Sequence, residues 1–466
     1  MTTMIDEHDL RDRLERAAAE VAAPPDLLPI IERRITTLGR RTAALRVAGA
    51  VAVVALAAGV ALVATGDDGD EAPVAVESTT TVSESPTTTT TPLAPGWAAM
   101  ADAPIAPRTD HLVLAMDDEV LVWGGRTFVP LPNWPMDGAV YAPATDSWRA
   151  VPDAPLPGFA DGVWTGSEAI LVSGGPPQTS PDMAPGPPGA AAFDPATDTW
   201  RPLAAPPAGV GVMGTYLVWT GTHVVVISPS DLLEGGPATV SVYDPATDTW
   251  AGGASTDALS SFGTAVWTGT EVLVVASAET DPAEPANDEV LVRAYDPVTD
   301  SWRSLPWGLG DGDRSWPVVA WTGDRLFVGG GVTYDGDEQA RAKQAALLDP
   351  TTGEWTPAAD APLAIFGPEE SAAIWTGDRV LTVSAGDDAF PILVQGPVPA
   401  LTYDPATDTW AEGPVRPDAG VARAGWVWAA GRAVVPLGGT PVPLSEDGAG
   451  PTCCTAGPAG GATYVP

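Results

Sequence analysis

A unit of about 52 residues recurs from residue 97 onward, and no other feature of the sequence restricts the fold as strongly. Each unit places an aromatic residue or Leu seven positions before a Trp. These pairs are Tyr141/Trp148, Phe193/Trp200, Tyr243/Trp250, Tyr295/Trp302, Leu348/Trp355 and Tyr403/Trp410. The Trp residues follow one another at intervals of 52, 50, 52, 53 and 55 residues. A steady period of this length indicates one supersecondary unit copied several times.

Each unit reads as four antiparallel strands. The first strand ends at a Trp-Thr-Gly step, as at 267–269, where the glycine supplies a positive φ for a tight turn. The second is an alternating run such as 271–275, and a variable loop follows it. The third ends at the Tyr, and an Asp-Pro-Ala-Thr-Asp turn leads into the fourth, which carries the repeat Trp. Four-stranded units repeated radially predict an all-β propeller.

The seventh unit is split between the two ends of the repeat region. Residues 427–466 supply three strands and stop before a repeat Trp. Residues 97–104 resemble a fourth strand without its third, and Trp97 precedes Trp148 by 51 residues, in step with the period. We therefore expect a seven-bladed propeller over 97–466, closed by the N-terminal strand 97–104, which leaves no free sheet edge.

A pair of glycines closes the second strand in four units, at Gly124-Gly125, Gly174-Gly175, Gly330-Gly331 and Gly438-Gly439. Together with the Tyr-x6-Trp element, this pattern resembles the kelch repeats of propellers like the central domain of galactose oxidase. The resemblance covers 370 of 466 residues. It implies the fold and leaves the function open, because kelch propellers include both binding platforms and enzymes.

The sequence before the repeats predicts a membrane anchor. Residues 1–46 form a short helical segment rich in Arg, and residues 47–65 are nineteen uncharged, mostly apolar residues. As a helix they span about 28 Å, the thickness of a bilayer core. Arg before the run and acids after it predict a cytoplasmic N-terminus, a single transmembrane helix and an extracellular propeller. A cleaved signal peptide is the alternative, but its apolar region is usually shorter. Residues 66–96 read as a Thr/Ser/Pro-rich extracellular stalk.

Charge excludes one class of partner. The chain carries 60 acidic and 22 basic residues, for a net charge of −38, so it should repel nucleic acids. Its single Lys and many Ala and Arg are typical of a GC-rich bacterial genome. The Arg-rich cytoplasmic segment resembles the juxtamembrane part of some actinobacterial anti-sigma-type proteins, without their His/Cys zinc motif.

Few residues suggest metal or covalent chemistry. The repeats contain two distant histidines, His111 and His223, and we find no paired His with a crosslinkable Cys and Tyr as in the copper site of galactose oxidase-like enzymes. We therefore predict no metal and no cofactor, with calcium at 311–313 or 335–338 as the alternative. The only cysteines, Cys453 and Cys454, are adjacent and outside the membrane, which predicts a vicinal disulfide; free or intermolecular thiols are the alternatives.

The alternating strands divide the propeller into two faces. The nearly identical Trp-Thr-Gly and Asp-Pro-Ala-Thr-Asp turns share the turn face, and the loops that vary from unit to unit share the opposite one, which we call the loop face. Binding residues belong on variable loops held by a rigid scaffold. The candidate binding residues on the loop face and channel rim are Arg108, His111, Trp134, Asp161, Trp307, Arg314, Trp316, Glu369, Glu370 and Arg423.

These features predict a membrane-anchored, monomeric propeller that binds a glycan, a peptide or an envelope protein through its loop face. Two alternatives stay open. The protein could be an envelope hydrolase that uses Glu369 or Glu370 at the channel mouth, or a surface sensor that signals through residues 1–46. We predict no catalytic residue with a defined role.

Overall fold

The computed structural model describes the repeat region in thirteen segments. They are residues 95–127, 133–174, 188–210, 214–229, 236–260, 263–277, 290–310, 314–335, 338–365, 373–383, 399–415, 425–436 and 461–466. The predicted cytoplasmic segment, transmembrane helix 47–65 and residues 66–94 of the predicted stalk lie outside these residues, and a strand begins at Gly96, one residue before the predicted closing strand. The described segments contain strands and no helix. Among these residues there is accordingly no helix long and apolar enough to cross a membrane.

The described strands form seven four-stranded antiparallel sheets and one three-stranded sheet. Three sheets are β2 (Leu112–Met116), β3 (Glu119–Trp123), β4 (Gly138–Ala142), β5 (Ser147–Val151); β6 (Asp161–Trp164), β7 (Ala169–Ser173), β8 (Gly189–Asp194), β9 (Thr199–Pro202); and β10 (Tyr216–Trp219), β11 (Val224–Ser228), β12 (Ala238–Asp244), β13 (Thr249–Thr256). The next three are β14 (Thr264–Trp267), β15 (Val272–Ser277), β16 (Val290–Asp296), β17 (Ser301–Leu305); β19 (Val318–Trp321), β20 (Leu326–Gly329), β23 (Ala345–Leu348), β24 (Trp355–Ala358); and β25 (Ala373–Trp375), β26 (Val380–Val383), β27 (Pro399–Asp404), β28 (Thr409–Val415). The last four-stranded sheet is β29 (Val427–Ala429), β30 (Arg432–Val435), β31 (Ala462–Val465) and β1 (Gly96–Ala99).

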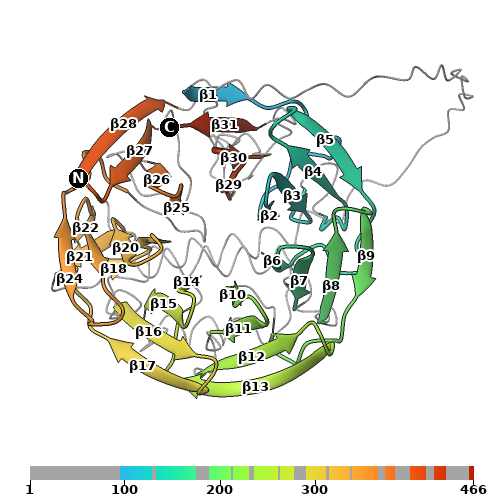
Figure 1. Ribbon diagram of the computed structural model, residues 1–466, viewed down its shortest axis with the longest axis horizontal. Coiled ribbons are helices and arrows are strands. Elements are labelled where there is room, and N and C mark those ends of the chain that lie inside the picture. Colours follow the sequence, from blue (N-terminus) through green and yellow to red (C-terminus); the bar gives the residue numbers. More distant parts are fainter. Residues whose placement is uncertain are drawn as a thin grey trace, which may run out of the picture. The chain divides into compact units, whose positions relative to one another are not determined.

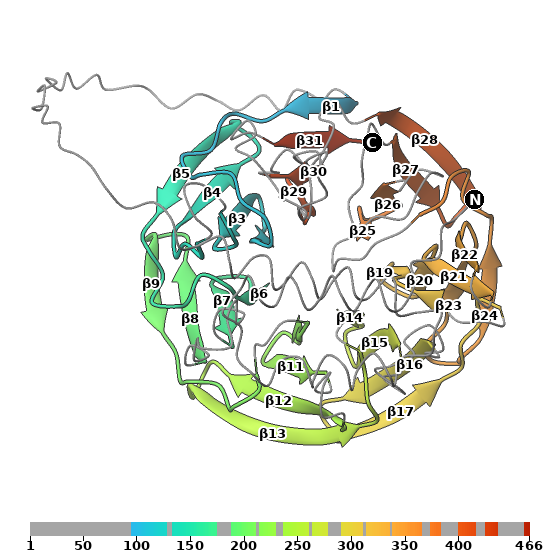
Figure 2. The same cartoon turned by 180° about the vertical axis from the view of Figure 1, so that it is seen from behind.

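The sheets are arranged as the blades of a β-propeller, which confirms the predicted all-β propeller fold. Figures 1 and 2 show them following one another around a common axis. In the four-stranded sheets one edge strand, such as β2, β6 or β29, lies toward the axis, and the opposite edge strand, such as β5, β9 or β1, lies along the rim. The four-stranded sheets share the same antiparallel strand order, so their innermost strands all run in the same direction along the axis. The first residues of these strands therefore lie at one face of the propeller.

The β29–β31 sheet takes its fourth strand from the other end of the repeat region. β1 pairs antiparallel with β31, with Trp97 opposite Tyr464 and Ala99 opposite Ala462. The Trp97 and Tyr464 ring centroids are 4.8 Å apart, as close as in the Tyr–Trp pairs of the other sheets. The two ends of the repeat region therefore share one sheet.

One sheet departs from the simple four-strand unit. Between β20 and β23 the chain forms an additional hairpin of β21 (Val332–Asp335) and β22 (Glu338–Arg341). β21 also pairs with β18 (Arg314–Ser315), which gives the three-stranded sheet. The repeat pattern did not predict this hairpin, because the sequence between the second and third strands varies in every unit.

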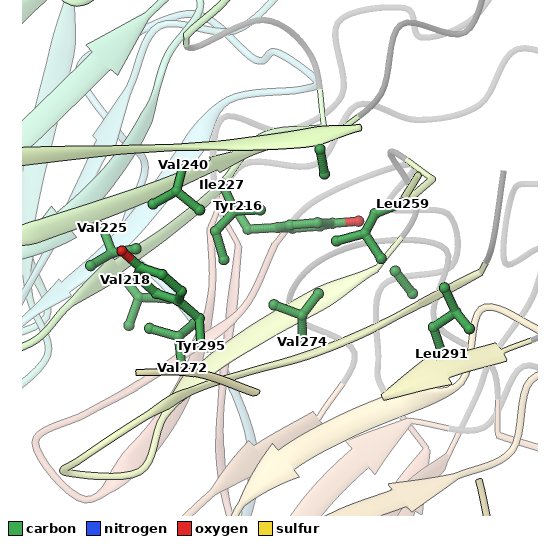
Figure 3. Packing of buried hydrophobic residues seen from close by; sticks show 12 residues of the cluster. Tyr216, Val218, Val225, Ile227, Val240, Leu259, Val272, Val274, Leu291 and Tyr295 are labelled. Atoms are coloured by element: carbon green, nitrogen blue, oxygen red, sulfur yellow. The ribbon is translucent and has the colours of Figure 1, made fainter. Parts of the chain in front are cut away.

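The hydrophobic core consists of clusters between neighbouring sheets. Figure 3 shows the cluster between the β10–β13 and β14–β17 sheets, in which Val225 and Ile227 of β11 face Val272 and Val274 of β15. All four side chains are fully or almost fully buried. The alternating strands thus bury one face against the preceding blade and the other against the next.

A repeated polar contact also joins each blade to the one before it. In the β10–β13 sheet, the indole N–H of Trp250 donates to the Ala204 carbonyl at 2.9 Å, and the Ala204 N–H donates to the Asp248 carboxylate at 2.8 Å. Tyr243 also donates its hydroxyl to Asp248 at 2.8 Å. We call this arrangement the inter-blade clamp. It recurs on Ala101, Ala254 and Ala359.

The clamp changes where proline occupies the clamped position. Pro152 accepts a hydrogen bond from Trp200 but has no N–H to donate. Arg149 takes over: its Nε donates to Asp198 at 3.0 Å and its Nη2 donates to the Pro195 carbonyl at 3.3 Å. In the second case Trp355 donates to the Pro306 carbonyl, and Arg303 donates to the Pro350 carbonyl at 2.8 Å, but residue 353 is Gly and supplies no carboxylate. In the third case Trp97 donates to the Pro414 carbonyl at 2.8 Å, and Ala411 stands where the other two units have Arg. The units of Trp200 and Trp355 also lack the clamp tyrosine, with Phe193 and Leu348 in its place.

Candidate functional site

Two of the predicted binding residues, Arg108 and Arg314, are buried and occupy equivalent positions in their units. Their exposed fractions are 1% and 4%. Each lies sixteen residues before the first glycine of a glycine pair and donates through Nη1 to that glycine's carbonyl, Gly124 for Arg108 and Gly330 for Arg314. The structure therefore places both guanidinium groups behind the loop face, where they support the end of the second strand.

The surroundings of the two arginines differ in charge. Arg108 forms an ion pair with Asp137, with Nη1 and Oδ1 2.7 Å apart. At the corresponding place Arg314 meets an amide, the Gln344 Oε1, 3.4 Å from its Nη2. Within the described residues no carboxylate forms an ion pair with Arg314, and burial lowers its pKa to about 10. Arg314 is thus a buried cation at neutral pH that has hydrogen bonds and no described counter-charge.

Exchanging the two partners should have opposite effects on stability. Asp137→Asn removes the counter-charge of the buried Arg108 and should lower the free energy of unfolding by about 1–3 kcal/mol. Gln344→Glu supplies a carboxylate to Arg314 and should raise the free energy of unfolding by about 1 kcal/mol or less. The gain is smaller than the loss in Asp137→Asn because position 344 is exposed. Thermal unfolding of the two variants checks this, and shifts in the same direction would contradict it.

His111 is buried beside Arg108 at the start of the innermost strand β2. Only 8% of the residue is exposed, and among the described residues neither ring nitrogen finds a hydrogen-bond partner of ordinary geometry. Burial, and then the charge of Arg108, lower the His111 pKa from 6.5 to about 4, while Asp110 acts weakly in the opposite direction. The imidazole is therefore neutral at pH 7 and does not add positive charge to the loop face.

The three predicted tryptophans lie in different surroundings. Trp134 is half-buried, with its ring edge-on to Phe159 at 5.5 Å and the Arg126 guanidinium 5.8 Å from its centroid. Trp307 follows the outermost strand β17 and packs against Trp355 at 5.7 Å, in the core between two blades. Trp316 is half-buried with φ of 54°, a strained conformation for a bulky residue.

Asp161 lies in the wall of a cavity of about 200 Å³ at the first residues of four adjacent innermost strands, β2, β6, β10 and β14. The strand order places this cavity at the loop-face end of the central channel. Its lining residues are Leu112, Val113, Asp161, Gly162, Thr215, Tyr216, Leu217, Gly263, Thr264 and Ala265. Sequence analysis found Asp161 and missed the others. The signal that could have found Thr215 and Thr264 is their place at the start of a first strand.

Several predicted residues lie outside the described part of the chain. They are Glu369, Glu370, Arg423, Cys453 and Cys454. The proposed channel-mouth carboxylates and the vicinal disulfide therefore stay predictions.

The side chains that could bind a metal lie apart from one another in the described part of the chain. No three His, Cys, Asp or Glu side chains there lie close enough together to hold an ion. His223, the second repeat histidine, bonds Thr222 through Nδ1 at 2.9 Å in a turn. The described residues thus do not provide a donor set for copper.

Comparisons with known proteins bear on the fold. No protein-family model and no curated protein match the chain. Among solved structures, a fungal alcohol oxidase of the AA5 family in complex with copper is similar at 16% identity and a TM-score of 0.55, covering 80% of this chain and 76% of that one. The structure of YjhT is similar at 12% identity and a TM-score of 0.46, covering 67% and 99%.

The copper-bound oxidase corrects one prediction. We predicted no metal and no cofactor, with calcium as the alternative, because the repeats hold two distant histidines and no paired His with a crosslinkable Cys and Tyr. That deduction is wrong, because a chain of the same fold carries copper. At 16% identity the likeness extends to the fold and not to the chemistry, and the chain has a β-propeller of the kelch or galactose oxidase type.

Proposed function

We propose that this protein is a binding module that captures a glycan or a peptide segment in the cavity at the loop-face end of its channel. The observation that supports this most directly is the cavity itself, since residues at the starts of four innermost strands, Asp161 and Thr264 among them, line it. A concave site with a few converging polar groups on a rigid scaffold is the usual form of a small-ligand site. The variable loops belong to the same face and would extend the contact.

The surroundings that we propose for this module follow from the sequence. Residues 47–65 would anchor the chain in the cell membrane, with residues 1–46 in the cytoplasm, the stalk 66–96 outside and a seven-bladed monomeric propeller beyond it. The ligand would then be an envelope component, and nucleic acids would be excluded by the charge of −38. An actinobacterial source would fit this arrangement.

Filling the cavity should abolish binding. We expect Thr264→Phe in the full-length chain to reduce retention on a glycan and peptide array at least tenfold, because the ring would occupy the cavity. The matched control is Val298→Phe, which places the same ring on the turn face, where Val298 is 90% exposed. Melting curves confirm that both variants fold. If Val298→Phe removes binding and Thr264→Phe does not, the binding face is the opposite one.

A further inference from the structure

We infer that acid opens the propeller at one place, the sheet formed by β29, β30, β31 and β1, which we call the closing sheet. The inference goes beyond the proposed function and does not depend on what the loop face binds. It depends on two features on opposite sides of the closing sheet: a seam toward β25–β28 that lacks the inter-blade clamp, and a buried histidine of the β2–β5 sheet.

The seam between β28 and the closing sheet lacks both the acid and the N–H of the clamp. Pro95 stands where five of the other six units have the clamp Asp, and Pro414 has no N–H to donate. Trp97 donates to the Pro414 carbonyl at 2.8 Å, and among the described residues of β28 and β1 this is the one hydrogen bond across the seam. The equivalent contact at Ala204 has two.

The tyrosine of the closing sheet shows the same loss. Four other units have a Tyr hydroxyl that donates to the clamp Asp at 2.8 Å, namely those of Tyr141, Tyr243, Tyr295 and Tyr403. No described group accepts from the Tyr464 hydroxyl, and burial alone raises its pKa. The hydrophobic cluster at this seam buries six described residues, and each of the other clusters buries nine or more. This seam is therefore the weakest in the described ring.

The other side of the closing sheet is attached at the rim. Ala101, two residues after β1, donates its N–H to Asp146 at 2.8 Å, and its carbonyl accepts the Trp148 indole at 2.9 Å. Met100 and Ile105 are buried in the cluster shared with β2–β5. When the unclamped seam parts, the closing sheet can turn about this attachment, and its inner end then moves away from β2.

His111 lies beneath that inner end. It is buried at the start of β2, close to the main chain of Pro436, which follows β30. Among the described residues no group bonds either ring nitrogen with ordinary geometry. The charged residues packed around this segment are Arg108, Asp110, Arg126 and Asp137. No described charged residue of the closing sheet acts on the imidazole, so the sheet covers His111 without supplying a counter-charge.

Protonation of His111 favours the open form. Burial, and then the charge of Arg108, lower the His111 pKa to about 4, against 6.5 for an exposed imidazole. Below pH 6.5 the exposed imidazole takes up a proton that the buried one does not. The closed form is therefore most stable above pH 6.5 and loses ground as the pH falls toward 4. Between pH 7 and pH 5 the ratio of open to closed molecules should rise about twentyfold.

Hydrogen exchange of the full-length chain at pH 7 and pH 5 tests the inference, with mass spectrometry as the readout and a correction for the intrinsic exchange rate at each pH. We expect the closing sheet to exchange faster than the β10–β13 sheet at both pH values. Its opening equilibrium should rise about twentyfold at pH 5. His111→Leu should remove this rise, because leucine does not titrate.

A second variant restores the missing clamp. Pro95→Asp combined with Pro414→Ala supplies the acid and the N–H, and should reduce opening of the closing sheet by about fivefold or more at both pH values. The matched control is Pro152→Ala, which makes the same change at a seam where Arg149 already bonds Asp198. It should leave exchange of the closing sheet unchanged.

Three outcomes overturn the inference. The first is equal protection of the closing sheet and the β10–β13 sheet at pH 5. The second is a rise that persists in His111→Leu, or an opening equilibrium that the two clamp substitutions leave unchanged. The third is faster exchange of all sheets together at pH 5, which would indicate unfolding of the whole ring and not opening at one seam.

Discussion

Acidification from pH 7 to pH 4 should lower the free energy of unfolding by about 3 kcal/mol through His111 alone. The His111 pKa is about 4 in the folded protein and 6.5 when the residue is free. Each pKa unit corresponds to about 1.4 kcal/mol. Because the unfolded chain binds the proton first, the stability is fully present above pH 6.5 and is lost as the pH falls toward 4.

Denaturant titrations followed by tryptophan fluorescence between pH 7 and pH 4 measure this effect. We expect His111→Leu to remove most of the pH dependence in this range. The clamp carboxylates act in a lower range: the Ala204 N–H and then the Tyr243 hydroxyl lower the pKa of Asp248, so its contribution is lost only below about pH 4. A His111→Leu variant with the full wild-type slope would show that another group titrates.

Gly330→Ala should destabilise the protein by about 2–5 kcal/mol. The residue has φ of +63°, and a Cβ would lie 2.0 Å from the Ile365 carbonyl oxygen of the next blade. Left-handed strain contributes about 1–2 kcal/mol and overpacking about 1–3 kcal/mol. The backbone cannot move aside easily, because the Gly331 N–H donates to the same carbonyl at 2.9 Å.

Gly353→Ala in the same sheet is the matched control. Gly353 has φ of +76°, but the nearest atom to its Cβ would be 3.4 Å away. Most other units have Asp at this position with φ near 50°, so a side chain is tolerated there. We expect its free energy of unfolding, measured by thermal melting, to fall by about 1 kcal/mol. Equal losses for the two variants would mean that φ alone, and not the approach of the next blade, requires the glycine at 330.

The sequence was sufficient for the fold because its signals are local. A Trp-Thr-Gly step or an Asp-Pro-Ala-Thr-Asp turn specifies a hairpin through residues that are neighbours in the chain. The inter-blade contacts were not predicted, because the partners of Trp250 and Asp248 lie more than forty residues away. A local trace exists in the Trp-Arg-x-x-Pro pattern at 148–152 and 302–306, which marks two of the three proline variants of the clamp.

The candidate site was predicted less well than the fold. Arg108 and Arg314 were chosen for their charge, and the structure places both in the scaffold behind the loop face. Asp161 was chosen for its position and does line the cavity. Thr215 and Thr264 were missed because their residue type does not distinguish them in a sequence rich in Thr, and only their place at the start of a first strand does. Charge alone does not separate a ligand-binding arginine from one that satisfies backbone carbonyls.

The inter-blade clamp also has a consequence for how such an array can lengthen by gene duplication. Each blade contacts its predecessor through a main-chain carbonyl, and on Ala101, Ala204, Ala254 and Ala359 through the N–H as well. Every residue offers the carbonyl, and every residue other than proline offers both atoms. A duplicated unit can therefore be placed after almost any other without a compensating substitution. A unit that ends in proline, as at Pro152, Pro306 and Pro414, offers only its carbonyl, and that carbonyl still accepts the next tryptophan. Because the contact uses main-chain atoms, one copy of the unit can replace another, and the side chains outside the contact can vary between copies.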